Sequence, residues 1–374
     1  MNILYTILGT YNSGGMERVL ANKANYLAKL GYTVTIVTTD QRDKKPYFEL
    51  DSSIILIDLK INYTDDLDKG ILSRGISYFK KQKLHRKKLT EILFKVKPEI
   101  TVSMFDNDAS FITHIADGSK KVLEIHFSRF KRLQYGRKGI WKLIDTYRNK
   151  SDLKTVKKFD RFIVLTEEDK AYWGSLPNIE VIPNANSFTS STQASLTNNS
   201  VLAIGRFDYQ KGFDDLIKIW QIVQQSNPKW KLNIYGHGPL ENDLKKLISS
   251  CNLNDSIVLR SPIKDIKSVY LDHSILVMTS RYEGLPMVLL EGQVCGLPLV
   301  SYACKCGPKD IITDGSNGFI IDEGDKSQFA SRLVSLMNND SARKTMGNNS
   351  LKNSENFTES KVMYKWIELF ENLM

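Results

Sequence analysis

The sequence predicts an α/β protein built from two Rossmann-like, doubly wound domains that face a cleft. Three observations support this fold class. The chain has 374 residues, which is more than a single hydrophobic core usually organises. Short apolar runs alternate with helical stretches in both halves, an order typical of parallel sheets. A polar segment at residues 187–199, without Gly or Pro, separates the two series.

The first half begins with a strand, a glycine-rich turn and a helix. The apolar run at residues 3–8 ends at Gly9, Asn12-Ser13-Gly14-Gly15 follows, and a helical pattern continues until Gly31. The next strand is expected at residues 34–37, so the order is β-α-β and the sheet is parallel. Further strands are expected at residues 54–59, 100–104, 122–125 and 162–165, and helices at residues 74–97 and 129–150.

The same alternation restarts after the polar segment. A strand is expected at residues 201–204 and a helix at residues 213–226. Then follow a strand at 231–235, a helix at 240–249, apolar segments at 257–259, 268–273, 275–278, 288–295 and 299–301, and a helix at 326–338. We therefore expect domains over residues 1–186 and 200–355, joined by a linker at 187–199. Residues 356–374 carry an amphipathic pattern and are expected to form a helix that packs back on a domain surface.

The composition is that of a folded globular protein, with 41% hydrophobic and 25% charged residues. No apolar run reaches the roughly 18 residues of a membrane span, and the N-terminus reads as a strand instead of a signal peptide. The sparse cysteines indicate a reducing, cytoplasmic location. Cys304 and Cys306 have no metal-ligand spacing and no second ligand pair, so no metal site is expected.

The formal net charge of +10 lies entirely in residues 1–186, which hold 32 Lys and Arg against 22 Asp and Glu. This excess indicates an anionic partner for the first half. Residues 74–97 contain nine Lys and Arg against Glu91 alone, and residues 129–150 contain eight against Asp145 alone. Apolar side chains accompany them, namely Ile76, Tyr78, Phe79, Trp141 and Tyr147. The pattern fits an anionic membrane surface, and a solvated helical face is the alternative.

Ligands of open α/β sheets bind at the carboxyl ends of strands, where four clusters of this sequence are expected. The first is the loop from Gly205 to Gly212, which carries Arg206 and Lys211. Two cations five residues apart suit a diphosphate, and the alternative is a surface loop with solvated charges. The second is Gly236-His237-Gly238-Pro239, where two glycines would let the backbone approach a ligand, although tight turns use the same residues.

The third cluster runs from Arg281 to Gly292. Gly284-Leu285-Pro286 opens an apolar helix whose free N–H groups suit a phosphate. Glu291 lies inside that helix and needs a partner, which is either a ribose diol or one of Arg206 and Lys211. The fourth cluster, Asn12 to Arg18, contains Gly14 and Gly15 and makes an anion-binding nest plausible. It does not match Gly-x-Gly-x-x-Gly, which weakens a nicotinamide interpretation.

Six segments are highly specific when taken in order and spacing. They are Asn12-Ser13-Gly14-Gly15-Met16-Glu17-Arg18, Val181-Ile182-Pro183-Asn184, Gly205-Arg206-(x4)-Lys211-Gly212, Gly236-(x)-Gly238-Pro239, Glu283-(x7)-Glu291, and Cys306-Gly307-Pro308-Lys309-Asp310-Ile311-Ile312. With them, nearly the whole chain resembles the retaining glycosyltransferases of the GT-B fold, in the large family 4 of sugar-nucleotide-dependent enzymes.

This resemblance implies a role for each site residue. Arg206 and Lys211 would hold the donor diphosphate, Glu283 the hydroxyls of the transferred sugar, and Glu291 the ribose. His126 would face the sugar, and Glu283, His126, Arg206 and Lys211 form the expected catalytic set. The expected donor-binding set is Gly15, Gly205, Arg206, Lys211, Gly236, Gly238, Ile263, Glu283, Gly284, Leu285, Pro286 and Glu291. Two departures from the family pattern are His237, where an acidic residue is usual, and Ser261-Pro262, where a glycine is common.

The resemblance further implies a metal-independent, retaining hexosyltransferase without a cofactor. It would move a hexose or N-acetylhexosamine from a UDP-linked donor to a glycan or lipid-linked oligosaccharide in capsule, lipopolysaccharide or other surface polysaccharide synthesis. The 1–186 domain would bind the acceptor and the 200–355 domain the nucleotide sugar. The protein would be cytoplasmic and peripheral on the inner membrane face. A nucleotide-sugar epimerase of the same fold and a basic nucleic-acid-binding protein are the rivals, but no nucleic-acid-binding motif is present.

Overall fold

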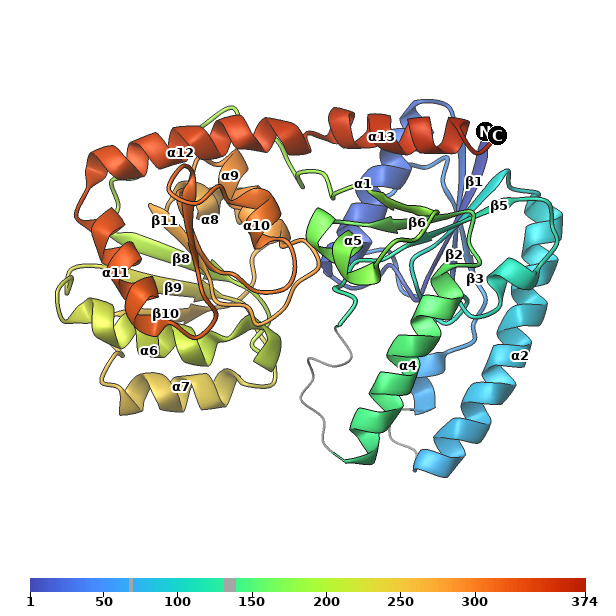
Figure 1. Cartoon of the computed structure of the whole chain (residues 1–374), viewed down its shortest axis with the longest axis horizontal. Helices are drawn as coiled ribbons and strands as arrows, with labels where there is room; N and C mark the ends of the chain where they lie inside the picture. The colour runs from blue at the N-terminus through green and yellow to red at the C-terminus, as the bar shows by residue number, and fades with distance from the viewer. Residues whose placement is uncertain (67–69, 131–138) are drawn as a thin grey trace. The chain divides into compact units, whose positions relative to one another are not determined.

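A computed structural model describes residues 1–66, 70–130 and 139–374 of the chain, and within these ranges the side chains of residues 71–72 and 140–143 are outside the description. The chain divides into two compact units. The N-terminal unit holds Met1–Leu165, Lys170–Ile182 and Val362–Met374, and the C-terminal unit holds Thr166–Asp169 and Pro183–Lys361. Each unit contains one open parallel sheet covered by helices, so the predicted pair of Rossmann-like domains is confirmed (Figure 1).

The N-terminal unit has seven strands in the order β3-β2-β1-β4-β5-β6-β7, and every neighbouring pair is parallel. The strands are β1 (Asn2–Ile7), β2 (Thr33–Thr38), β3 (Ile55–Asp58), β4 (Ile100–Ser103), β5 (Lys120–Glu124), β6 (Arg161–Val164) and β7 (Ile179–Val181). Ile3, Leu4 and Tyr5 of β1 are fully buried because the strand has neighbours on both sides and helices on both faces.

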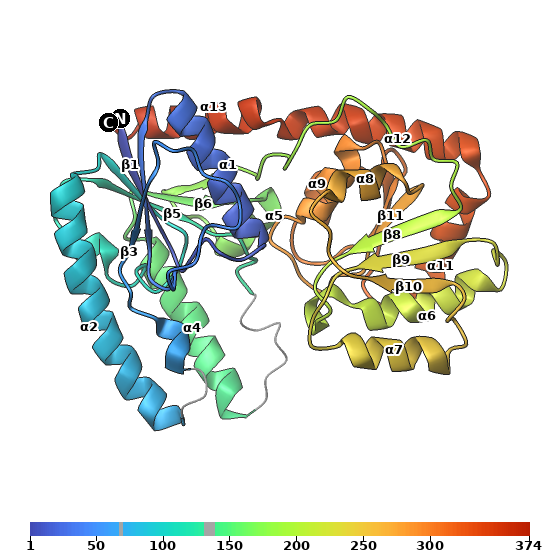
Figure 2. The same ribbon diagram turned by 180° about the vertical axis from the view of Figure 1, so that it is seen from behind.

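The helices of this unit are α1 (Gly15–Lys29), α2 (Ile71–Val96), α4 (Ile140–Val156), and all but the first three residues of α5 (Glu167–Trp173) and α13 (Glu359–Glu371), with 3-10 turns η1 (Tyr63–Asp66) and η2 (Ile112–His114). Figure 2 shows α1 and α13 on one side of the sheet and α2 and α4 on the other. The bounds expected for the helix at residues 129–150 were wrong at both ends, since α4 continues to Val156. Residues 129–130 form a turn, α4 begins at Ile140, and residues 131–138 lie outside the described part.

The C-terminal unit has six parallel strands in the order β10-β9-β8-β11-β12-β13. The strands are β8 (Ser200–Ile204), β9 (Lys231–Tyr235), β10 (Ile257–Arg260), β11 (Ile275–Met278), β12 (Leu299–Tyr302) and β13 (Gly318–Ile321). The helices are α6 (Phe213–Gln224), α7 (Glu241–Ser250), α8 (Ile266–Leu271), α9 (Met287–Val294), α10 (Pro308–Ile311), α11 (Lys326–Met337) and α12 (Asp340–Ser354), with η3 (Tyr209–Lys211) and η4 (Glu355–Phe357).

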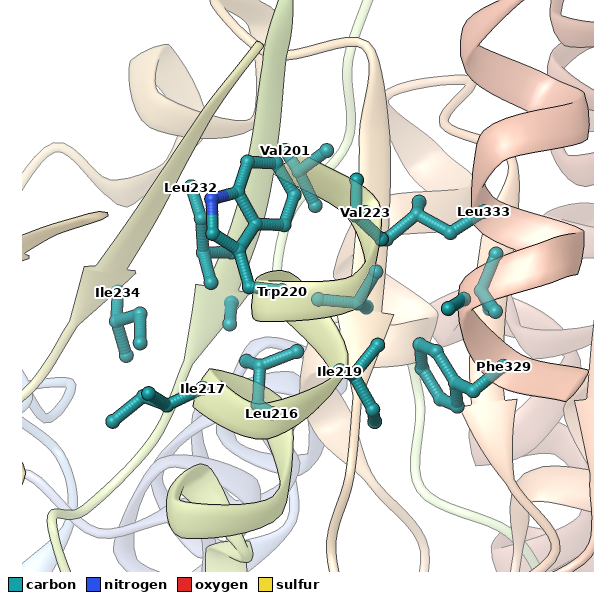
Figure 3. Packing of buried hydrophobic residues seen from close by; sticks show 14 of the residues in the cluster. Val201, Leu216, Ile217, Ile219, Trp220, Val223, Leu232, Ile234, Phe329 and Leu333 are labelled. Carbon is teal, nitrogen blue, oxygen red and sulfur yellow. The ribbon is translucent and has the colours of Figure 1, made fainter. Parts of the chain in front are cut away.

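The core of the C-terminal unit forms where α6 and α11 pack on the sheet. Trp220 of α6 is fully buried among Val201, Leu232 and Leu333, as Figure 3 shows. Its indole N–H donates to Oγ of Ser256 at 3.2 Å, so its polar group is satisfied inside the core. This rigid packing holds β8 in place, and therefore also the loop that follows it.

The polar segment at residues 187–199 packs on the C-terminal unit. Ala194 and Leu196 are buried, and the amide of Ala194 donates to the carbonyl of Cys295 at 2.9 Å. The division between the units falls at Ile182 and Pro183, close to the boundary expected at residue 186.

Candidate functional site

The predicted site residues fall in two groups: Gly15 and His126 belong to the N-terminal unit, and the others to the C-terminal unit. In the C-terminal sheet the chain runs outward in opposite directions from β8 and β11, which are neighbours. A ligand of such a sheet binds at the carboxyl ends of the two strands at this switch point. The loop carrying Arg206 and Lys211 follows β8, and the loop carrying Glu283 follows β11, as the sequence predicted.

Hydrogen bonds, an ion pair and close backbone packing fix the β8 loop and the start of α6 against the β11 loop. Oγ1 of Thr279 donates to the carbonyls of Lys211 and Gly212 at 3.2 and 3.1 Å. Gly212 has a φ of +63°, and a Cβ on it would lie 2.2 Å from the Thr279 carbonyl oxygen, so only glycine fits here. Arg281 donates to the carbonyl of Tyr209 at 2.7 Å and pairs with Asp214 at 2.8 Å. The two loops therefore form one rigid platform.

Lys211 and Glu283 meet on this platform. Nζ of Lys211 lies 2.6 Å from Oε1 of Glu283, although the residues are 72 positions apart. Glu283 is 8% exposed, and its backbone pairs with Lys305 and Cys306. Its carboxylate is therefore buried and paired with Lys211. The turn that carries Glu283 is consequently not exposed to solvent.

Arg206 is the exposed cation of the platform. Its side chain is 69% exposed, and its Nε and Nη2 lie 2.9 and 2.7 Å from Oδ2 of Asp208. Asp208 also accepts from the amide of Lys211 at 3.3 Å, which caps η3. An anion that approaches Arg206 would have to compete only with an exposed ion pair, which is a weak competitor.

Gly236 and Gly238 allow close packing of two loops. A Cβ on Gly236 would lie 1.9 Å from the carbonyl oxygen of Gly205, and one on Gly238 would lie 2.6 Å from that of Phe207. The amide of Phe207 also donates to the carbonyl of His237 at 2.9 Å. The β8 loop therefore fills the space that these glycines leave, which supports the alternative of tight backbone packing over a close approach to a ligand.

The stretch Gly284-Leu285-Pro286 opens α9 as predicted, with Pro286 at the N-cap. Leu285 is buried, so its side chain serves the core, and the contribution left to this stretch is the free backbone N–H groups of a helix start. Gly307, with φ +99°, packs against it, because a Cβ there would lie 2.5 Å from Cδ of Pro286. This end of α9 is thus held in place by the loop after β12.

Glu291 has a partner that the sequence did not indicate. It is 5% exposed in α9, and its Oε2 accepts a hydrogen bond of 2.6 Å from the hydroxyl of Tyr270 in α8. Arg206 and Lys211 were the expected structural alternatives, but they pair with Asp208 and Glu283 instead. Ile263 lies beyond the carboxyl end of β10, and its side chain is 44% exposed.

The glycine-rich start of α1 already faces a carboxylate of the chain. Gly14 is the N-cap, Gly15 is the first helical residue, and a Cβ on Gly14 would lie 2.2 Å from Oε2 of Glu17. Burial raises the pKa of Glu17, while its own backbone N–H, Asn12 and His126 oppose that rise. An anion nest at this end would therefore compete with Glu17.

His126 follows β5, where its Nε2 lies 3.0 Å from Oε1 of Glu124. Glu124 is buried and is also paired with Lys23 of α1 at 2.5 Å. Sequence analysis missed Lys23, although a lysine on the apolar face of Leu20, Ala24 and Leu27 was a signal that it has a buried partner.

Three carboxylates gather at the carboxyl ends of the N-terminal strands. Oδ2 of Asp108 accepts from Oγ1 of Thr6 at 2.7 Å, and Oδ1 of Asp40 accepts from the amide of Thr64 at 2.9 Å. Burial raises the pKa of Asp106 to about 7, and Asp108 and Asp40 add to that rise. Within the described ranges, no group of His, Cys, Asp or Glu has an arrangement that suits a metal ion.

Two family models match the chain. The model described as Glycosyltransferase Family 4 matches residues 13–185, and the model described as Glycosyl transferases group 1 matches residues 187–353. The chain is 28% identical over 367 residues to an uncharacterized glycosyltransferase of Haemophilus influenzae, with 97% of this chain and 98% of the relative covered. It is 27% identical to the amylovoran biosynthesis glycosyltransferase AmsD of Erwinia amylovora, with 98% and 99% covered.

A third relative comes from Campylobacter jejuni and is named GalNAc-alpha-(1->4)-GalNAc-alpha-(1->3)-diNAcBac-PP-undecaprenol alpha-1,4-N-acetyl-D-galactosaminyltransferase. It is 26% identical, with 97% of this chain and 96% of the relative covered. Among solved structures, the pneumococcal O-GlcNAc transferase GtfA in complex with UDP and GlcNAc superposes with a TM-score of 0.79 at 16% identity, with 100% and 99% covered. At this identity the likeness shows the fold.

Proposed function

Because the chain belongs to the glycosyltransferases that join a Family 4 domain to a group 1 domain, we propose that it transfers a hexose or N-acetylhexosamine from a UDP-linked donor with retention of configuration. The acceptor is a glycan or lipid-linked oligosaccharide in surface polysaccharide synthesis. The proposed donor site rests on the ion pair between Lys211 and Glu283 at the switch point of the C-terminal sheet.

The names of the similar proteins support the substrate classes. The GtfA structure contains UDP and GlcNAc, and the Campylobacter relative is named for an undecaprenol-linked glycan and for N-acetyl-D-galactosaminyl transfer. The Erwinia relative is named for amylovoran biosynthesis. These are properties of the relatives, and we extend them to this chain on the strength of full-length similarity.

Departure of the nucleoside diphosphate is the difficult step, because negative charge grows on the leaving oxygen while positive charge grows on the anomeric carbon. Lys211, Arg206 and the backbone N–H groups at the start of α9 stabilise the leaving oxygen. These groups supply the positive charge that the step needs, so we propose that transfer requires no bound metal ion and no cofactor. The carboxylate of Glu283 accepts hydrogen bonds from hydroxyls of the transferred sugar.

The remaining predicted residues complete the proposal. Glu291, oriented by Tyr270, accepts from the ribose hydroxyls, and Ile263 contacts the base. His126 contacts the transferred sugar. Gly205, Gly236 and Gly238 act by letting the loops of the platform pack, and Gly284 and Pro286 by placing the backbone at the start of α9. Gly15 lets the start of α1 lie close to the phosphates or the acceptor.

We also propose that the N-terminal unit rests on an anionic membrane surface. Ile76 and Phe79 of α2 are 61% and 74% exposed. Because they are three positions apart in the sequence, they lie on the same face of the helix. Exposed Lys80, Lys83 and Lys87 continue along that face. Aromatic and basic side chains on one face of a helix are typical of interfacial binding. No helix of the described ranges is long and apolar enough to span a membrane, and Trp141 lies outside the described side chains.

Vesicle sedimentation tests the membrane proposal. The variant Lys80→Gln/Lys83→Gln/Lys87→Gln should bind vesicles containing phosphatidylglycerol roughly ten- to a hundredfold more weakly, since each basic residue near such a surface contributes about 1 kcal/mol. The matched control, Lys218→Gln/Lys246→Gln/Lys344→Gln, removes the same charge from exposed positions of the C-terminal unit. If both variants lose the same affinity, only net charge matters and the α2 surface is not the binding face.

The donor proposal is tested by thermal stabilisation with a panel of nucleotide sugars, followed by product analysis. We expect a UDP-sugar to raise the Tm and to give an α-configured product from an α-configured donor, with activity retained in EDTA. Release of an epimerised free sugar without transfer would identify the epimerase alternative. Stabilisation by no nucleotide sugar would overturn the donor site.

A further inference from the structure

Three ionisable side chains form a buried, connected group inside the N-terminal unit. Lys23 of α1 and Glu124 of β5 are 3% and 1% exposed, and Nζ of Lys23 lies 2.5 Å from Oε2 of Glu124. The other oxygen, Oε1, lies 3.0 Å from Nε2 of His126. At that separation the two groups are paired by charge, although the ring N–H is not aligned with the carboxylate. One carboxylate thus connects a buried ammonium to the predicted site histidine.

The surroundings of Lys23 are aromatic. Its Nζ lies 3.7 Å from the ring centroid of Trp366 in α13 and 5.6 Å from that of Tyr5 in β1. The ring faces attract the ammonium, but Lys23 still loses its water. Packing alone does not require this cation, because an apolar residue at position 23 would continue the face of Leu20 and Leu27. Replacing a buried ion pair with apolar residues is often neutral or stabilising.

Folding stability alone therefore does not explain the ion pair between Lys23 and Glu124. The negative charge that this pair maintains on Glu124 offers an explanation. Burial acts to raise the pKa of Glu124, but Lys23 and His126 outweigh it and hold that pKa at about 2. The carboxylate is consequently ionised throughout the neutral range. A fixed carboxylate beside an imidazole orients the ring and determines which nitrogen carries the proton.

The groups around His126 come from three elements. Glu124 is on β5, whereas Lys23 and Glu17 are on α1, and His126 contributes to the charge environment of Glu17. Tyr5 of β1 stays neutral, because burial and Glu124 raise the pKa of its hydroxyl far above the ordinary value. Within the described ranges, His126 thus interacts with the two carboxylates of Glu124 and Glu17, and Lys23 balances the charge of Glu124.

We propose that Glu124 is the positioning residue for His126, and that Lys23 serves to keep Glu124 ionised in a buried place. Glu124 holds one ring nitrogen of His126 and leaves the other for a sugar hydroxyl. The contact with a sugar hydroxyl rests on the proposed function, whereas the orientation of the ring by Glu124 is a property of the N-terminal unit itself.

Three variants separate positioning from stability. Lys23→Met leaves a buried carboxylate without its cation, and Glu124→Gln leaves a buried cation without its carboxylate, so each should lower the Tm by roughly 5 °C or more. The double variant Lys23→Met/Glu124→Gln removes both charges at similar volume and should recover most of that loss. Its kcat should nevertheless stay about 10- to 100-fold below wild type, as expected when a group that orients a site histidine is lost.

A matched control lies at the opposite end of β5. Lys121 pairs with Asp117 four residues earlier, and both side chains are nearly buried. The double variant Lys121→Met/Asp117→Asn should also recover its Tm, but with wild-type kcat, because this pair does not contact His126. Recovery of kcat together with the Tm in Lys23→Met/Glu124→Gln would show that the pair is structural and would overturn the proposal.

Proton NMR at a single pH gives a readout that does not depend on transfer. The chain has five histidines, and His126→Gln identifies the His126 Cε1–H signal. If Glu124 orients the ring, the nuclear Overhauser contacts of this signal should change in Glu124→Gln and should stay unchanged in Lys121→Met/Asp117→Asn. Unchanged contacts in Glu124→Gln would overturn the positioning role. Changed contacts in a protein without transferase activity would sustain it and reject the proposed function.

Discussion

Nζ of Lys211 lies 2.6 Å from Oε1 of Glu283, and this ion pair joins the loop after β8 to the loop after β11. In the proposed donor site, the cation for the diphosphate and the carboxylate for the sugar therefore neutralise each other before any substrate is bound. The donor has an anionic diphosphate, which would bind Lys211, and neutral sugar hydroxyls, which would bind Glu283. Donor binding would therefore replace the ion pair by these two separate sets of contacts. The two residues should consequently respond to mutation in opposite ways.

Lys211→Met should weaken UDP binding about 10- to 100-fold, since a charge-assisted hydrogen bond contributes roughly 1.5–3 kcal/mol. Glu283→Gln should leave UDP affinity unchanged or raise it, because it releases Lys211 from its competitor. The same Glu283→Gln variant should lose at least about 100-fold in transfer, because it loses charged hydrogen bonds to the sugar. Calorimetry with UDP and a transfer assay measure the two effects. Equal loss of UDP affinity in both variants would contradict this arrangement.

Arg206→Ala should weaken UDP binding by roughly 10-fold or more while leaving the Tm unchanged. The reason is that its side chain is 69% exposed and pairs with the neighbouring Asp208, so the fold depends little on it. Lys218→Ala, an exposed cation on α6 outside the site, is the control. Unaltered UDP affinity in Arg206→Ala would place the diphosphate elsewhere.

Tyr270→Phe should reduce both stability and nucleotide affinity. The hydroxyl of Tyr270 donates to the buried carboxylate of Glu291 at 2.6 Å, so its loss should cost about 1.5–3 kcal/mol in the free energy of unfolding. Nucleotide binding should weaken severalfold, because Glu291 is no longer oriented. Urea unfolding and calorimetry measure these changes.

Tyr302→Phe is the control for that variant. Tyr302 is 1% exposed, and its hydroxyl makes no hydrogen bond within the described ranges. Its removal should be neutral or stabilising. Similar losses in the two variants would mean that the hydroxyl of Tyr270 has no special role.

Asp106 should make the stability of the protein depend on pH. Burial raises the pKa of this carboxyl from its ordinary 3.8 to about 7, so the folded state holds the proton more tightly than the unfolded state. The stability that the group contributes is full below pH 4 and is lost as pH rises to about 7. The variant Asp106→Asn has no carboxyl group to titrate at this position, so it should not lose this stability as the pH rises.

At pH 8 the Asp106→Asn variant should be about 1–2 kcal/mol more stable than wild type, and at pH 4 the difference should be close to zero. Urea unfolding at both pH values measures it, with Asp243→Asn on the exposed side of α7 as the control. A difference between variant and wild type that is the same at both pH values would rule out titration of Asp106.

The sequence by itself determined the fold class and the position of the platform. Alternating apolar runs and helical periods predicted two parallel sheets, and glycines at strand ends predicted the loops at Gly205–Gly212 and Gly284–Pro286. These are local signals, because a strand, a turn and a helix start are each encoded within a few neighbouring residues. The order of strands then places both loops at one edge of the C-terminal sheet.

The tertiary structure alone decided which side chains are partners. Lys211 meets Glu283, Tyr270 meets Glu291, and Lys23 meets Glu124 across separations of 72, 21 and 101 residues. None of these three pairs was identified from the sequence, because a buried carboxylate reveals that it needs a donor but not which donor will reach it. That choice depends on strand order, on helix rotation and on the packing that removes water, and these arise only when distant parts of the chain come together.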